Sequence, residues 1–202
     1  RQGLGACGYG GDKGIFGFGY DGSNNVGMTN LVSNSGVVAS DVTAVGTVRS
    51  DLAACEYGGD KGIFGFGYDD SSYTAVTNLV SNAGVVATDV TGVGTARQYL
   101  AACSYGYDKG IFGFGKDPTG SLTGVTNLVS NVGVVATDVT AVGTARRYAA
   151  ATQYGGDKGI FGYGNDGSNT AMTSLVSNTG VVSSDVTGVG TARARLAACS
   201  FN

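Results

Sequence analysis

The chain has 202 residues, a net charge of −3 and only 13% charged residues, a size that allows one or two domains with a buried core. The 12 basic residues are spread along the chain, which argues against nucleic-acid binding, and no apolar segment approaches the roughly 20 residues of a membrane helix. Hydrophobic residues at 42% argue against disorder, and the lack of His leaves few groups for acid–base catalysis, so we expect a folded, non-catalytic protein without membrane insertion.

The first 48 residues contain short β-prone runs separated by Gly, Asp and Asn, with no sustained helical period. Gly and Asn at the separations allow the positive φ angles of tight turns. The pattern predicts four strands, at Leu4–Tyr9, Gly14–Gly19, Met28–Ser33 and Val37–Val45.

This unit is repeated along the chain. The motif Tyr-Gly-x-Asp-Lys-Gly-Ile-Phe-Gly begins at Tyr9, Tyr57, Tyr105 and Tyr154, at spacings of 48, 48 and 49 residues, with Gly or Tyr at x. We divide the chain into repeats 1–48, 49–96, 97–145 and 146–192, followed by an extra copy of the first strand at 193–202, all in one domain.

Four strands and their connections fill about 48 residues, which is the length of a four-stranded propeller blade. The sequence therefore predicts an all-β fold, a β-propeller of four tandem four-stranded blades. An alternative is that the four blades are half of an eight-bladed ring formed by two chains. A β-solenoid ranks second because its repeats are usually shorter.

The first strand of the unit occurs once more often than the rest. It starts at Arg1, Arg49, Arg97, Arg146 and Arg193, and its small side chains suit the crowded axis of a propeller. A closed ring would leave one copy without a place. The chain is then a piece of a longer array, or carries the extra strand as a tail, or uses it to complete a second subunit.

The order of these motifs resembles kelch repeats, whose period is about 50 residues. The resemblance rests on Arg-x-x-Leu-Ala-Ala-Cys, Asp-Lys-Gly-Ile-Phe-Gly-Phe-Gly, Thr-Asn-Leu-Val and Thr-Ala-Arg, and it covers the whole chain. In contrast to kelch blades, the chain has Gly17-Phe18-Gly19 in place of a Gly-Gly pair and contains no Trp. The resemblance implies a propeller with a protein-binding or glycan-binding surface, and no particular reaction.

Differences between the copies concentrate in the loop after the second strand. Loops on a rigid scaffold often bind ligands, whereas plain surface variation explains the same pattern, and none of these loops matches an EF-hand. The candidate ligand-facing residues are Tyr20, Asp21, Tyr68, Asp69, Lys116, Asp117, Asn165 and Asp166.

Each unit carries an Asp eight residues before an Arg, which favours a repeated structural ion pair over an anion site. The predicted pairs are Asp41/Arg49, Asp89/Arg97, Asp138/Arg146 and Asp185/Arg193. The cysteines, Cys7, Cys55, Cys103 and Cys199, occupy one repeat position, so we expect free, buried thiols. Without His and without a C-x-x-C pair, we predict neither a metal site nor a cofactor.

These features together predict a non-catalytic binding or scaffold module with a protein or glycan ligand. The alternatives are a structural subunit of an extracellular or virion fibre that uses the surplus strand, and an engineered or recently amplified array. We expect a homo-oligomer through blade or strand completion as one form of partner. An extracellular or virion surface is favoured over the cytoplasm because the composition is low in charge and rich in Gly, Ser, Thr and Asn.

Overall fold

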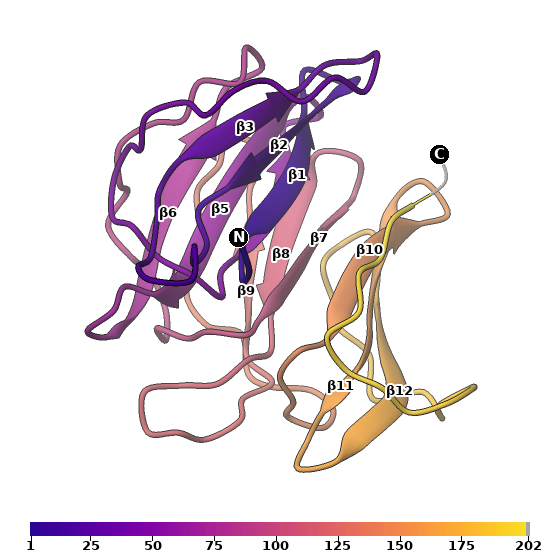
Figure 1. Cartoon of the computed structure of the whole chain (residues 1–202). Helices are drawn as coiled ribbons and strands as arrows, with labels where there is room; N and C mark the ends of the chain where they lie inside the picture. Colours follow the sequence, from indigo (N-terminus) through magenta and orange to yellow (C-terminus); the bar gives the residue numbers. More distant parts are fainter. Residues whose placement is uncertain (201–202) are drawn as a thin grey trace.

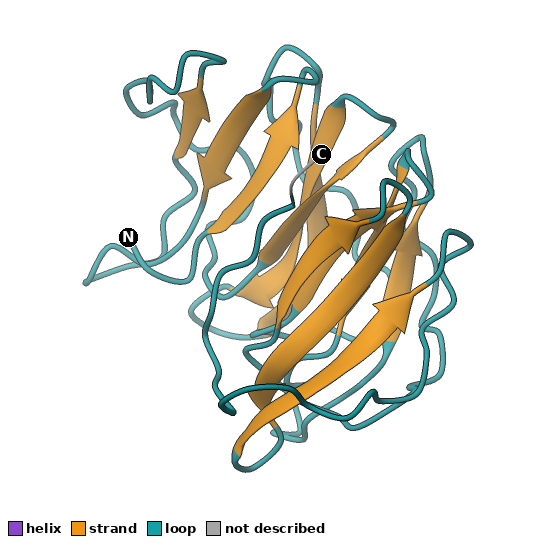
Figure 2. Cartoon of the chain, turned by 90° about the vertical axis from the view of Figure 1, so that its right-hand side faces the viewer, coloured by secondary structure: helices purple, strands orange, loops and turns teal. Residues whose placement is uncertain are grey.

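The computed structural model describes residues 1–200, which form twelve strands in four three-stranded antiparallel sheets. The first sheet contains β1 (Gly5–Tyr9), β2 (Lys13–Gly17) and β3 (Thr29–Val32), and the second β4 (Ala53–Tyr57), β5 (Lys61–Tyr68) and β6 (Tyr73–Val80). The third contains β7 (Ala101–Tyr105), β8 (Lys109–Gly113) and β9 (Thr126–Val129), and the fourth β10 (Ala150–Tyr154), β11 (Lys158–Asn165) and β12 (Asn169–Val176). The sheets follow one another in chain order (Figure 1), and the described residues contain strands and loops without a helix (Figure 2).

The all-β class and the repeated sheets are confirmed, and the first three predicted strands lie within two residues of β1, β2 and β3. The turn between β1 and β2 contains Gly10 and Gly11 at φ 61° and 79°, in the left-handed region that Gly enters without steric cost. Local sequence therefore determines these hairpins.

The fourth predicted strand of each unit is wrong. In the first copy, Thr29 bridges Val42 and Val32 bridges Val38, so the pairing shifts by one residue between the two bridges. The side chain of Asn30 fills the break, because its Nδ2 donates to the carbonyl oxygen of Ala39 at 3.1 Å. This outer segment lies along β3 as isolated bridges instead of a fourth strand, and the other copies repeat the arrangement.

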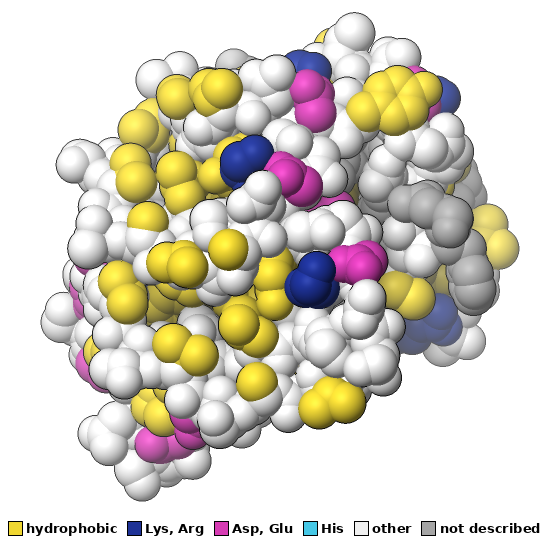
Figure 3. All heavy atoms as spheres, turned by 90° about the horizontal axis from the view of Figure 1, so that it is seen from above, with side chains coloured by type: hydrophobic (Ala, Val, Ile, Leu, Met, Phe, Trp, Pro, Cys, Tyr) yellow, Lys and Arg dark blue, Asp and Glu magenta, His cyan; other side chains and the backbone are white. Residues whose placement is uncertain are grey.

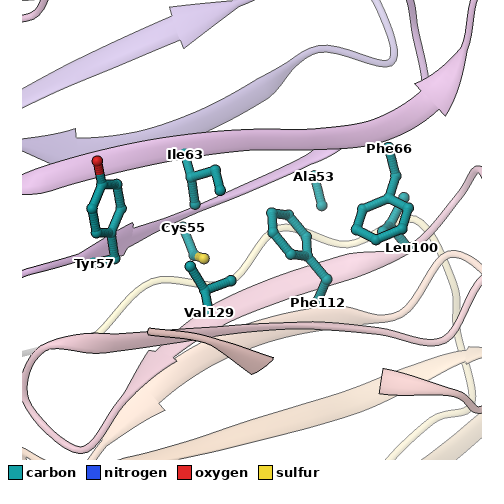
Figure 4. Close-up of a cluster of buried hydrophobic side chains, with 8 residues drawn as sticks. All are labelled: Ala53, Cys55, Tyr57, Ile63, Phe66, Leu100, Phe112 and Val129. Atoms are coloured by element: carbon teal, nitrogen blue, oxygen red, sulfur yellow. The ribbon is translucent and has the colours of Figure 1, made fainter. Parts of the chain in front are cut away.

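Successive sheets stack face to face, and buried hydrophobic side chains fill the three spaces between them. We call the side of a sheet that faces the preceding sheet its leading face, and the opposite side its trailing face. Figure 4 shows the second space, where Cys55 and Ile63 of the trailing face meet Phe112 and Val129 of the next leading face.

The stack does not close into the predicted propeller. Closure would place the trailing face of the fourth sheet against Phe16 on the leading face of the first. Phe16 is instead 40% exposed, whereas Phe64, Phe112 and Phe161 at the same repeat position are 0% exposed. Tyr154 at the opposite end is 36% exposed, so four sheets form an open arc.

Glycine in the middle strand allows neighbouring sheets to approach. A Cβ on Gly110 would lie 2.6 Å from Sγ of Cys55 in the preceding sheet, closer than packed atoms tolerate. Gly14 holds the same position in the first sheet, where the nearest atom would be Cβ of Val32 at 3.6 Å.

Gly110→Ala should therefore lower the free energy of unfolding by about 1–3 kcal/mol through overpacking, whereas Gly14→Ala should change it by less than about 1 kcal/mol. Urea denaturation followed by circular dichroism measures both. In the double variant Cys55→Ala/Gly110→Ala, part of the loss should be recovered, because the Cys55 sulfur atom is removed. Equal effects of the two glycine substitutions would contradict the stacking described above.

Candidate functional site

The predicted ligand-facing residues fall into two groups according to where their side chains lie in the structure. Tyr20 and Tyr68 line a cavity of about 840 Å³ at one end of the inner strands, whereas Lys116 and Asn165 at the same repeat position do not. The four Asp residues that follow these positions cap their own loops: Oδ1 of Asp21, for example, accepts hydrogen bonds from the backbone N–H of Ser23 and Asn24. The same capping role is seen at Asp69, Asp117 and Asp166.

All four repeats and the segment after Arg193 contribute to the cavity. Its lining combines tyrosine rings with amide, hydroxyl and carboxylate groups and one guanidinium. The tyrosines are Tyr20, Tyr68, Tyr73, Tyr99 and Tyr148, and the polar residues are Gln2, Asn25, Ser50, Asp51, Asp70, Gln98 and Arg195. Each of the five tyrosines is half-buried, so part of each ring faces the cavity.

A chain of backbone hydrogen bonds positions the inner end of this cavity. The N–H of Asp51 donates to the carbonyl of Gly3 at 2.7 Å, and the same bond links Tyr99 to Asp51, Tyr148 to Tyr99 and Arg195 to Tyr148. These five residues have φ angles from 54° to 62°. Left-handed backbone is uncommon for side chains such as Tyr, and such residues cluster at functional sites. We call them the inner ring.

The side chains of the inner ring contact one another. The rings of Tyr99 and Tyr148 have centroids 4.4 Å apart, and the guanidinium of Arg195 lies 4.3 Å from the Tyr148 ring centroid. Burial raises the pKa of Asp51, opposed by the charge of Arg195 and a hydrogen bond from Tyr99. The pKa of Tyr99 is raised by burial, by Tyr148 and by Asp51, which keeps the phenol protonated as a hydrogen-bond donor at neutral pH.

Sequence reasoning missed the inner ring. Its signal is variation among copies, because Gly3, Asp51, Tyr99, Tyr148 and Arg195 occupy one repeat position two residues after the repeated Arg. The segment between the repeated Arg and the first strand varies at this position and at the one before it, which holds Gln2, Ser50, Gln98, Arg147 and Ala194.

The repeated arginines lie between sheets. Arg49 is 0% exposed and its guanidinium lies 4.3 Å from the ring centroid of Phe18, in the preceding sheet. Its Nε donates to the carbonyl of Phe66 at 2.8 Å and its Nη2 to Oδ1 of Asn78 at 2.7 Å, both in the following sheet. Burial lowers the pKa of Arg49 to about 10, opposed by the charge of Asp89.

The acid beside each arginine lies about 40 residues after it, in the copy that the arginine begins, and not eight residues before it as the spacing predicted. Asp89 lies against Arg49, Asp138 against Arg97, and Asp185 forms an ion pair with Arg146 at 3.4 Å. Asp41, predicted to pair with Arg49, instead accepts from Asn30, which binds Arg1. Arg193 begins the surplus copy, whose described residues 193–200 contain no Asp, and it lies exposed, 4.4 Å from the Tyr163 ring centroid.

The four cysteines are free thiols, of which Cys55 and Cys103 are buried, Cys7 is half-buried and Cys199 is exposed. Burial raises the pKa of Cys7 and of Cys103 to about 12, so both stay protonated and are poor metal ligands at neutral pH. Residues 1–200 contain no cluster of three or more His, Cys, Asp or Glu side chains arranged to hold a metal ion.

Charged side chains on the surface occur in small groups in which opposite charges lie next to each other. Figure 3 shows charged side chains singly or in opposite-charge pairs among uncharged ones, without a broad patch of one sign on the face in view. The turn pairs are examples, such as Lys13 and Asp12 at 2.9 Å and Lys61 and Asp60 at 2.7 Å.

No known family model matches this chain, and no curated protein matches it at a significant level. Among the described residues there is no helix of the length and hydropathy needed to cross a membrane.

Arg97→Ala should lower the free energy of unfolding by about 3–5 kcal/mol, because it leaves the buried carbonyl of Phe114 and Oδ1 of Asn127 without a donor. Arg193→Ala removes the same residue type at the same repeat position where it is exposed, and should cost less than about 1 kcal/mol. Urea denaturation of both variants measures the difference. Similar losses would contradict the inter-sheet role.

Stability should also fall at acidic pH. Although burial works in the opposite direction, hydrogen bonds from Thr95 and Asn127 and the charge of Arg97 hold the pKa of Asp138 below its ordinary 3.8. A lowered folded-state pKa contributes stability that is complete above 3.8 and is lost as the pH falls through the folded value. Urea denaturation at a series of pH values should show this loss, with a shallower decline in Asp138→Asn. An unchanged decline would refute the contribution of this carboxylate.

Proposed function

We propose that the protein is a non-catalytic binding module whose cavity, bounded by the inner ring and the five tyrosines, takes a neutral glycan. The observation that carries the proposal is the lining itself, where tyrosine rings alternate with amide and hydroxyl groups. Sugars present apolar C–H faces and hydroxyl edges, and Tyr offers a ring face together with a polar tip. The volume of about 840 Å³ lies in the range of small-molecule sites, roughly 300–1,000 Å³.

The charges in the cavity favour a neutral ligand. Both Asp51 and Arg195 line the cavity, and the charge of Arg195 lowers the pKa of Asp51, so the cation offsets part of the negative charge there. The buried Gln98 and Ser50 add neutral donors and acceptors near the same end. An anionic sugar would meet the carboxylates of Asp51 and Asp70, and a cationic ligand would meet the guanidinium of Arg195.

The cavity also fits a scaffold role better than catalysis. Of its two acids, Asp51 is offset by the charge of Arg195, and the Tyr99 phenol that donates to Asp51 has a raised pKa, which makes it a poor nucleophile. The inner-ring part of the binding surface comes from one repeat position in successive copies, so a different side chain at that position changes the ligand preference without changing the backbone.

The test is binding of the full chain to an array of neutral and sialylated oligosaccharides, followed by calorimetry on the best neutral hit. Tyr20→Ala should weaken that binding by about tenfold or more, because it removes a ring from the cavity wall. Tyr107→Ala is the matched control, since Tyr107 is 75% exposed and lies outside the cavity, and it should leave the affinity unchanged.

Absence of binding to every glycan on the array would reject the proposal. Equal loss in both tyrosine variants would place any binding outside the cavity. A preference for sialylated over neutral sugars would contradict the charge argument.

A further inference from the structure

The leading face of the first sheet is half of an interface that the chain makes three times internally. In the second, third and fourth sheets this face is covered by the preceding sheet, and Val80, Val129 and Val176 are 0% exposed there. At the first sheet, Val32 is half-buried and Phe16 is 40% exposed.

The trailing face of the fourth sheet is the other half. Tyr9, Tyr57 and Tyr105 are 4%, 4% and 2% exposed on the trailing faces of the first three sheets. Tyr154 at the same repeat position is 36% exposed. The open leading face of the first sheet and the open trailing face of the fourth sheet are therefore the two halves of the contact that recurs between internal sheets. Each is the kind of surface that covers the other inside the chain.

The surplus copy of the first strand begins to dock on the fourth sheet as an internal copy does. The N–H of Gly164 donates to the carbonyl of Arg193 at 3.0 Å, as that of Gly19 does to Arg49 at 2.9 Å. The N–H of Arg195 then continues the inner ring by donating to Tyr148.

The segment beyond Arg195 lacks the partner that the internal copies have. Cys55 and Cys103 lie in β4 and β7, which pair with β5 and β8, whereas residues 196–200 form no strand within the described chain. Ala197, Ala198 and Cys199 are exposed. Cys199 lines a cavity of about 590 Å³ together with Phe16 and with residues from the strands of all four sheets.

We propose that the chain assembles head to tail, with residues 196–200 of one copy pairing with β2 of a second copy in place of that copy's β1. The leading face of the completed sheet then covers the trailing face of the fourth sheet. The internal register, in which Cys7, Cys55 and Cys103 lie opposite Ile15, Ile63 and Ile111, places Cys199 opposite Ile15 of the second copy.

The composition of β1 favours its replacement by residues 196–200 of another copy. It carries Gly5 where the internal copies carry Ala53, Ala101 and Ala150, and Gly weakens a strand interior. The surplus copy carries Ala197 at this position and is the better strand former. Because the interface joins different surfaces of the two copies, it produces either a closed ring or an open polymer.

A cross-link tests the register. Ile15→Cys in the full chain places a thiol opposite Cys7 in the structure and opposite Cys199 of a second copy in the proposed assembly, and opposed antiparallel residues lie within disulfide reach. Mild oxidation should give disulfide-linked oligomers on a non-reducing gel, with the position-15 peptide joined to the Cys199 peptide in mass spectrometry. The additional Cys199→Ser change should abolish them.

Ile63→Cys is the matched control, because Cys55 lies opposite Ile63 inside the second sheet. It should give a disulfide within one chain and no oligomers. If Ile15→Cys bonds only to Cys7 in monomers, or to Cys199 of its own chain, the proposal is overturned.

Mass in solution provides a second readout that needs no new cysteine. Light scattering on the full chain from about 1 µM to about 1 mM should show a mass rising to at least about twice the 20.1 kDa of one chain. A chain ending at Leu196 should remain monomeric over the same range. A constant 20.1 kDa for the full chain would overturn the proposal, and glycan binding by the monomer would be unaffected by that result.

Discussion

The arginine buried between neighbouring sheets holds the arc together. The guanidinium of Arg97 lies 4.2 Å from the ring centroid of Phe66 in one sheet and donates to Phe114 and Asn127 of the next. Burial lowers the pKa of Arg97 to about 10, yet the group stays charged at neutral pH. A buried charge is tolerated only when its hydrogen-bond partners are in place, so each arginine fixes the distance and rotation between two sheets.

Each arginine contacts only two neighbouring sheets. The stability of the array is therefore approximately a sum of the contacts between neighbouring sheets, as in other repeat proteins. The last interface is the least well satisfied: Ser174 stands where the earlier copies have Asn, and Nε of Arg146 has no partner. Its guanidinium instead contacts Asp185 directly at 3.4 Å. Because fewer groups pair there, we expect the fourth sheet to open more readily than the inner ones.

The sequence allowed the repeat, the all-β class and three strands of each unit to be predicted, because alternation and glycine turns act locally. The absence of a fourth strand could not be predicted from the sequence, because the break in pairing at Asn30 depends on a side-chain hydrogen bond to another segment. The acid partners were misassigned for a related reason. In a periodic sequence the spacing between Asp and Arg is equally consistent with partners from the same copy or the next, and only the stacking of sheets distinguishes them.

The inner ring shows how one frame can carry different side chains. Its residues are held by backbone hydrogen bonds of 2.7–3.0 Å, and these bonds do not depend on side-chain identity. Gly3, Asp51, Tyr99, Tyr148 and Arg195 can therefore differ, while Arg49 and its equivalents, whose side chains bridge two sheets, recur in every copy. Positions fixed through side chains build the arc, and positions fixed through the backbone are free to form a binding surface.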